Sequence, residues 1–307
     1  MSAAFIFMKK LLLFIAIVFF VYNAEAQIDP IKYPTYTDID TALLSKKAVY
    51  SISFRDKGLY NLPPDIIKLD SLFFLNVMGN HLEKMDKVMF SLKQLEILNV
   101  NENSIKFIPD EIAELKKLKT FSINLNSLTN INSNISKLQS LKVVHFESNN
   151  LSVFPESLLN IPSLEEINLH SNQISYVSDR LDKIKNLKYL NLSSNQINDL
   201  GEIKLPKKLK YLELQKNSII QLPETLFQSE NIEYLNLSDN VITQISPKIM
   251  KLKNAVSINL ANNKLKDLPI DIQHLQKLKT LILVGNPMNK ETIAKLKTLM
   301  PHTTIYF

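Results

Sequence analysis

The stretch Leu95–Lys117, LEILNVNENSIKFIPDEIAELKK, contains one full copy of a pattern that recurs along most of the chain. Apolar residues stand at positions 1, 4, 6, 11, 14, 18 and 21 of this copy, and asparagine stands at position 9. Copies in the same register follow every 23 residues, except that one copy has 22. Such a strict period predicts a solenoid, in which each copy packs on its neighbours. The copies begin at Val49, Leu72, Leu95, Leu118, Leu141, Leu164, Leu187, Leu209, Ile232, Ala255 and Leu278.

The alternation inside each copy predicts a short β-strand. Positions 4 and 6 are apolar, so a strand there buries these two side chains and turns positions 3, 5 and 7 outward. Prolines at position 15, as in Ile108-Pro109, favour the start of a short helical or extended return segment. Each copy is therefore predicted to be a strand, a turn and a return.

Asparagine occupies position 9 in ten of the eleven copies, and Lys57 replaces it in the first. A chain that turns inward there removes backbone N–H and C=O groups from water, and a side-chain amide can satisfy both because it donates and accepts. The sequence therefore predicts a structural ladder of asparagines. Its members are Asn80, Asn103, Asn126, Asn149, Asn172, Asn195, Asn217, Asn240, Asn263 and Asn286.

The pattern LxxLxLxxNxLxxLPxxIxxLxx resembles that of the leucine-rich repeat family, from about Val49 to Phe307. The resemblance implies an α/β solenoid: a leucine-rich repeat arc with a parallel β-sheet on the concave face and short helical or extended segments on the convex face. It implies no single function, because the same scaffold serves many partners.

The N-terminus reads as a secretory signal peptide over residues 1–26. Lys9 and Lys10 precede an apolar run from Leu11 to Tyr22, and Ala24-Glu25-Ala26 forms a cleavage site. An uncleaved anchor is the weaker alternative, because a spanning helix needs about 20 apolar residues. We expect an exported protein, periplasmic or secreted, without membrane insertion after cleavage. The chain has no cysteine, whereas exported animal and plant members of the family usually carry disulfide-bonded caps, so a bacterial origin fits better.

Three further segments complete the predicted organisation: an N-terminal cap at 27–48, repeats at 49–286 and a C-terminal cap at 287–307. Both ends of a solenoid expose core that something must cover. Thr37 with Asp40 three residues later predicts a helix start in the first cap. In the second cap, the sequence predicts a helix over Ile293–Met300 and a final strand over Thr303–Phe307.

The sequence offers no catalytic motif, so we expect no enzyme activity and no cofactor. Its four glycines are scattered, so neither a P-loop nor a GxGxxG turn can form, and no GxSxG or HExxH occurs. His170 with Glu147 and Glu166 offers side chains of metal-ligand type. Solvated polar side chains are the simpler interpretation, and no metal site is predicted.

The outward strand positions contain two candidate partner-binding groups. Tyr189, Tyr211 and Tyr234 occupy position 3 of successive copies, where they either form a binding ladder, with Glu213 and His170 at its edge, or merely stack as strand residues. Phe73 and Phe74 form an apolar patch that either binds a partner or is covered by the N-terminal cap.

We therefore expect a non-catalytic binding module that recognises a protein or peptide on the concave sheet. Recognition of a glycan or cell-surface polysaccharide is the alternative, because asparagine recurs at position 5 and amides hydrogen-bond hydroxyls. The chain has 36 basic and 30 acidic residues, and this mixed charge argues against a nucleic-acid groove.

Overall fold

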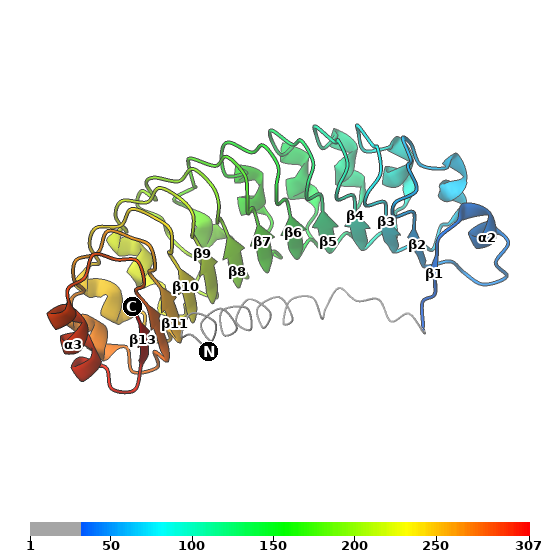
Figure 1. Cartoon of the computed structure of the whole chain (residues 1–307). Helices are drawn as coiled ribbons and strands as arrows, with labels where there is room; N and C mark the ends of the chain where they lie inside the picture. Colours follow the sequence, from blue (N-terminus) through cyan, green and yellow to red (C-terminus); the bar gives the residue numbers. More distant parts are fainter. Residues whose placement is uncertain (1–31) are drawn as a thin grey trace.

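The computed structural model describes residues 32–307, so the predicted signal peptide lies outside the described residues. The chain forms an arc with one parallel β-sheet along the inner face and short helices along the outer face (Figure 1). The predicted leucine-rich repeat arc is confirmed.

Within residues 32–307 the sheet has thirteen strands in sequence order, each pairing in parallel with the next. Register follows the repeat, so that equivalent positions of neighbouring copies lie side by side, as Tyr211 does between Tyr189 and Tyr234. The strands are β1 (Thr35–Tyr36), β2 (Ser51–Ser53), β3 (Phe74–Asn76), β4 (Ile97–Asn99), β5 (Thr120–Ser122), β6 (Val143–His145), β7 (Glu166–Asn168), β8 (Tyr189–Asn191), β9 (Tyr211–Glu213), β10 (Tyr234–Asn236), β11 (Ser257–Asn259), β12 (Thr280–Ile282) and β13 (Thr304–Tyr306).

The core runs along the whole arc between the sheet and the outer segments. Leu98 and Val100, at positions 4 and 6, are fully buried, and so are Ile105 and Ile112 of the same copy. Equivalent residues of most other copies belong to the same continuous apolar cluster or pack against it. Each copy therefore buries its apolar side chains only by stacking on its neighbours.

The asparagines at position 9 join successive copies through hydrogen bonds. Asn172 is typical: its Oδ1 accepts from the Leu151 N–H at 3.1 Å, and its Nδ2 donates to the Phe146 carbonyl of the preceding copy at 3.0 Å. All ten make both of these bonds to the preceding copy. Inward backbone groups are thus satisfied without water.

The residue before each ladder position has a left-handed backbone in all eleven copies, a feature that the apolar pattern did not reveal. Gly79 and Gly285 suit this conformation, whereas Leu125 adopts it with a φ of 54°. A β-carbon on Gly79 would lie 1.9 Å from the Asp56 Oδ1 of the preceding copy. Position 8 is therefore under a conformational constraint in every copy, and at Gly79 a larger residue would also displace the Asp56 side chain.

Most return segments contain a 3₁₀ helix of three to five residues. Of the two predicted possibilities, a helical or an extended return, most copies therefore adopt the helical one. The copy of 22 residues, 187–208, contains no helix, so the helical row is interrupted there. The 3₁₀ helices are η1 (Pro64–Lys68), η2 (Lys87–Ser91), η3 (Asp110–Glu114), η4 (Ser133–Lys137), η5 (Glu156–Asn160), η6 (Leu181–Lys183), η7 (Glu224–Gln228), η8 (Pro247–Lys251) and η9 (Ile270–His274).

The two α-helices of residues 32–307 lie at the ends of the arc (Figure 1). The first, α2 (Ile39–Leu43), starts after Asp38, whose carboxylate accepts from the Thr41 N–H, so the predicted start at Thr37 was wrong by one residue. The other, α3 (Lys290–Leu299), precedes β13, and its Leu296 is buried against the last repeats.

Candidate binding surface on the concave sheet

Charged side chains are strongly segregated on the inner face. Among the outward strand positions 3, 5 and 7 of the eleven copies, Arg55 is the only lysine or arginine, whereas three are glutamates, Glu147, Glu166 and Glu213. Lysines are common at position 2, along the border of the sheet, where they form salt bridges with glutamates of the same row, as Lys210 does with Glu233 at 2.8 Å. The inner face is thus acidic although the whole chain has a formal charge of +6.

The three predicted tyrosines lie in neighbouring strands, but they do not form a uniform ladder. The rings of Tyr211 and Tyr234 stack at 4.8 Å with an angle of 3° between their planes. Tyr189 is tilted by 46° from Tyr211 and is only 8% exposed, so it offers a partner much less surface than its outward strand position suggested. Its hydroxyl instead accepts a hydrogen bond from Asn191, and its ring is part of the packed sheet surface.

A hollow of about 880 Å³ lies on the inner face beside Tyr234. Position 3 changes there from large to small side chains, because Ser257, Thr280 and Thr304 follow Tyr234 in successive strands. This decrease in size is readable in the sequence and was missed. The hollow is lined by Glu147, Asn168, His170, Tyr189, Asn191, Ser193, Glu213, Gln215, Lys216, Tyr234, Leu235, Asn236, Ser238, Asp239, Val256, Ser257, Asn259, Lys279, Thr280, Ile282, Thr304 and Tyr306.

Glu213 lies in β9, in the wall of this hollow. Burial raises the pKa of its carboxyl group, while hydrogen bonds from the side chains of Asn236 and Gln215 act in the opposite direction. The charge of Glu213 in turn contributes to the raised pKa of Tyr189, although burial of the phenol is the larger cause. Glu213 is therefore a carboxylate with amide donors in a poorly solvated place.

The two histidines on the sheet serve different local networks. His170 Nδ1 lies 2.8 Å from Ser193 Oγ, and its Nε2 lies 2.9 Å from Ser171 Oγ, so both ring nitrogens are engaged beside the hollow. His145 Nε2 lies 2.8 Å from Glu166 Oε1. Within residues 32–307, no three metal-ligating side chains of the histidine, cysteine, aspartate or glutamate type converge.

Phe73 and Phe74 do not form one open patch. Phe73 is at position 2, on the border of the sheet, where its ring meets Tyr33 edge-on at 5.0 Å and lies 5.9 Å from Tyr50. Phe74 is at position 3 of β3, and both phenylalanines are partly buried. The N-terminal segment thus contributes Tyr33 to an aromatic cluster that includes Phe73.

The asparagines at position 5 have a local structural role. Asn168 Oδ1 accepts from the His170 N–H at 3.1 Å, and its Nδ2 donates to Glu147 at 2.7 Å. The same bond to the N–H of position 7 is made by all six asparagines of this row. Asparagine at this position therefore stabilises the end of each strand whatever the protein binds.

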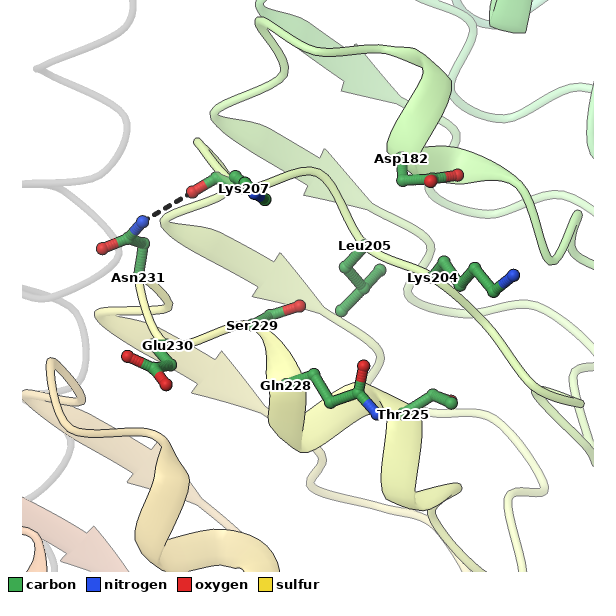
Figure 2. A pocket seen from close by; sticks show the side chains of 9 residues that line it. All are labelled: Asp182, Lys204, Leu205, Lys207, Thr225, Gln228, Ser229, Glu230 and Asn231. Carbon is green, nitrogen blue, oxygen red and sulfur yellow. Dashed lines mark hydrogen bonds between the residues drawn. The ribbon is translucent and has the colours of Figure 1, made fainter.

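A second hollow, of about 460 Å³, opens where the helical row is interrupted. Figure 2 shows Leu205 and Lys204 on the connecting strand-like segment, with Asp182 on one side and Thr225 and Gln228 on the other. Asn231 Nδ2 donates to the Lys207 carbonyl at 2.7 Å along its rim. Its lining mixes both signs of charge and indicates no particular ligand.

Two family models match the chain. A model described as leucine-rich repeats in two copies matches residues 162–205, and one described as leucine-rich repeat matches residues 70–128 and 207–251. No curated protein sequence matches.

Solved structures share the arc. A chain of the octameric complex of latrophilin 3, Unc5D and the FLRT2 leucine-rich repeats is 23% identical, with a TM-score of 0.73 and coverage of 85% of both chains. A TDR receptor is 26% identical, with a TM-score of 0.69 and coverage of 84% of this chain and 47% of the receptor.

The leucine-rich repeat ectodomain of GASSHO1/SCHENGEN3 from Arabidopsis thaliana, solved in complex with CASPARIAN STRIP INTEGRITY FACTOR 2, is 26% identical, with a TM-score of 0.57. The match covers 78% of this chain and 32% of that ectodomain. Repeat pattern, family models and architecture agree: the chain is a leucine-rich repeat protein.

Proposed function

We propose that this protein is a non-catalytic binding module that recognises a protein or peptide on its concave sheet. The observation that carries the proposal is the hollow beside the stacked pair Tyr211 and Tyr234. Tyrosines on a rigid sheet supply large contact area at a low entropic cost, and such residues commonly contribute much of the binding energy at protein interfaces.

The structural relatives support a macromolecular partner. The GASSHO1/SCHENGEN3 ectodomain, which is 26% identical to this chain, was solved in complex with CASPARIAN STRIP INTEGRITY FACTOR 2. A protein of this fold thus engages a partner. The sheet of the present chain offers a continuous row of strands along which an extended segment can lie.

A serine, a histidine and a glutamate contact one another on the described part of the sheet, but burial of the serine argues against a catalytic role. Ser122 Oγ lies 3.3 Å from His145 Nδ1, and the other ring nitrogen of His145 contacts Glu166. Ser122 is buried, however, so a substrate carbonyl would not reach its Oγ. The three residues form a structural network between strands.

Glycan recognition is the second candidate, favoured by the tyrosines together with amide and hydroxyl groups in the hollow. The asparagines at position 5 support it less than the sequence suggested, because their Oδ1 atoms already accept backbone hydrogen bonds. Fewer acceptors remain for sugar hydroxyls.

Two parallel binding screens test the proposal. The purified protein is used to select from a displayed library of random peptides and is also applied to a glycan array. We expect selected peptides that lose binding when Tyr211 and Tyr234 are replaced by serine. Glycan binding without peptide binding would replace the proposal with the second candidate.

We further propose export from a bacterial cell, on the basis of the signal-like residues 1–26 and the absence of cysteine. In the part of the chain that the structure describes, no helix is long and apolar enough to cross a membrane. Mass spectrometry of the protein from its native host should find Gln27 at the N-terminus, and retention of residues 9–22 would contradict the proposal.

A further inference from the structure

The hollow on the inner face has an unmatched acidic side. Glu213 lies in its wall, and no salt bridge of the described residues includes this carboxylate. Lys216 and Lys279 line the hollow only at positions 8 and 2, which flank the strands. The hollow therefore contains the negative charge of Glu213, while the lysines that line it lie only along its borders.

A second observation indicates a missing donor at the same place. Gln215 follows Glu213 by two residues and faces the same side of the sheet; its Oε1 is buried and has no hydrogen-bond partner. A buried acceptor without a donor costs about 1–3 kcal/mol. The Gln215 residue as a whole is only partly buried, so its side chain can turn this acceptor toward a ligand that donates hydrogen bonds to the Glu213 carboxylate.

The tyrosines complete the recognition chemistry. Tyr211 and Glu213 stand two residues apart on one strand, a separation of about 7 Å, and Tyr234 lies beside Tyr211 in the next strand. A side chain with an apolar stem and a cationic end can pack its stem on the tyrosines while its end reaches the carboxylate.

Resting on the proposed function, we propose that the hollow binds a lysine or arginine side chain of an extended, basic segment of a protein partner. Glu213 is the counter-ion, Gln215 Oε1 accepts a further hydrogen bond from the cation, and Tyr211 with Tyr234 holds the stem. An acidic segment would instead meet Glu147 and Glu213 without a compensating cation on the strands.

The test is a selection from a displayed library of random 12-residue peptides on wild-type protein, on Glu213→Gln and on Glu111→Gln. The first variant keeps the shape of the side chain and removes its charge. The second removes an equal charge from an exposed site on the convex face. Circular dichroism spectra establish that each variant is folded, and Thr280→Lys, which places a competing cation in the hollow, serves as an independent variant.

We expect peptides selected on the wild type and on Glu111→Gln to be enriched in lysine or arginine at one position. A synthetic peptide from this pool should bind Glu213→Gln and Thr280→Lys at least about tenfold more weakly, as expected for a buried charge pair that loses one partner. Peptides selected without such enrichment, or bound equally by Glu213→Gln, would overturn the inference alone. Selection of no peptide on any protein would overturn the proposed function and the inference with it.

Discussion

Replacing Asn172 by alanine removes one rung of the asparagine ladder from the middle of the arc. The wild-type side chain accepts from the Leu151 N–H at 3.1 Å and donates to the carbonyls of Phe146 at 3.0 Å, Leu169 at 3.1 Å and His170 at 3.3 Å. The substitution deletes all of these bonds at a buried position.

The four backbone groups bonded by Asn172 do not lose equally. Phe146 O keeps a bond from Asn149 at 3.2 Å, and Leu169 O keeps one from Asn195 at 3.0 Å. The His170 carbonyl keeps a bond from the Ser148 N–H at 2.9 Å. Among residues 32–307 the Leu151 N–H has no second acceptor, so it alone is orphaned, at about 1–3 kcal/mol, and the weakened carbonyls add roughly 1 kcal/mol together. We expect the free energy of unfolding to fall by about 2–4 kcal/mol.

Urea denaturation followed by circular dichroism measures the loss, and hydrogen exchange of a peptide that contains Leu151 localises it. Asn168→Ala is the matched control: it removes a bond to the His170 N–H and one to Glu147, both partly exposed, at an expected cost of about 0.5–1 kcal/mol. Equal losses for the two variants, or unchanged exchange at Leu151, would refute the ladder as the source of stability.

Leu125→Gly should raise the free energy of unfolding by about 1 kcal/mol in urea denaturation, because leucine there adopts a left-handed backbone with an exposed side chain. Gly79→Ala should lower the free energy of unfolding by about 1 kcal/mol, because alanine is strained at a φ of 71° and the Asp56 side chain must also move aside; an unchanged midpoint would refute this reasoning. Burial raises the pKa of Glu213 above its ordinary value of 4.5. The stability that the protonated carboxyl group contributes is therefore full below pH 4.5 and is lost as pH rises through the folded-state pKa. The free energy of unfolding of the wild type should fall relative to that of Glu213→Gln between pH 4.5 and 7. Parallel midpoints at both pH values would contradict this assignment. Tyr189→Ala should lower the free energy of unfolding by about 3 kcal/mol in urea denaturation, because it removes a buried aromatic ring. A loss close to zero would show that Tyr189 is only a surface residue.

The fold was predictable because the repeat itself encodes it. A period of 23 residues fixes which side chains stack, and the positions of apolar residues and asparagine determine strand, turn and core. The backbone at position 8 was not predictable from residue type, because Leu125 and Glu102 have the same left-handed conformation as Gly79. Packing of neighbouring copies imposes it.

The candidate site was only partly predictable. Which residues face inward follows from strand alternation, and this placed Tyr211, Tyr234 and Glu213 on one surface. The burial of each side chain could not be predicted from strand alternation, because it depends on how neighbouring side chains pack. Tyr189 is tilted against Tyr211 and is covered, whereas Tyr234 borders small residues and a hollow. Cover of Phe73 by the N-terminal segment was one of two alternatives in the sequence, but its contact with Tyr33 in particular could not be predicted because the two residues are 40 positions apart.

The most direct test of the binding surface is the affinity of a peptide selected on wild-type protein, measured by fluorescence anisotropy against three proteins. These are the wild type, Tyr234→Ser in the wall of the hollow, and Ile67→Ser on the exposed convex face. We predict that Tyr234→Ser weakens binding at least about tenfold, as loss of an aromatic anchor does, and that Ile67→Ser leaves it unchanged. Equal affinity for wild type and a folded Tyr234→Ser variant would contradict the assignment of the concave hollow as the binding site.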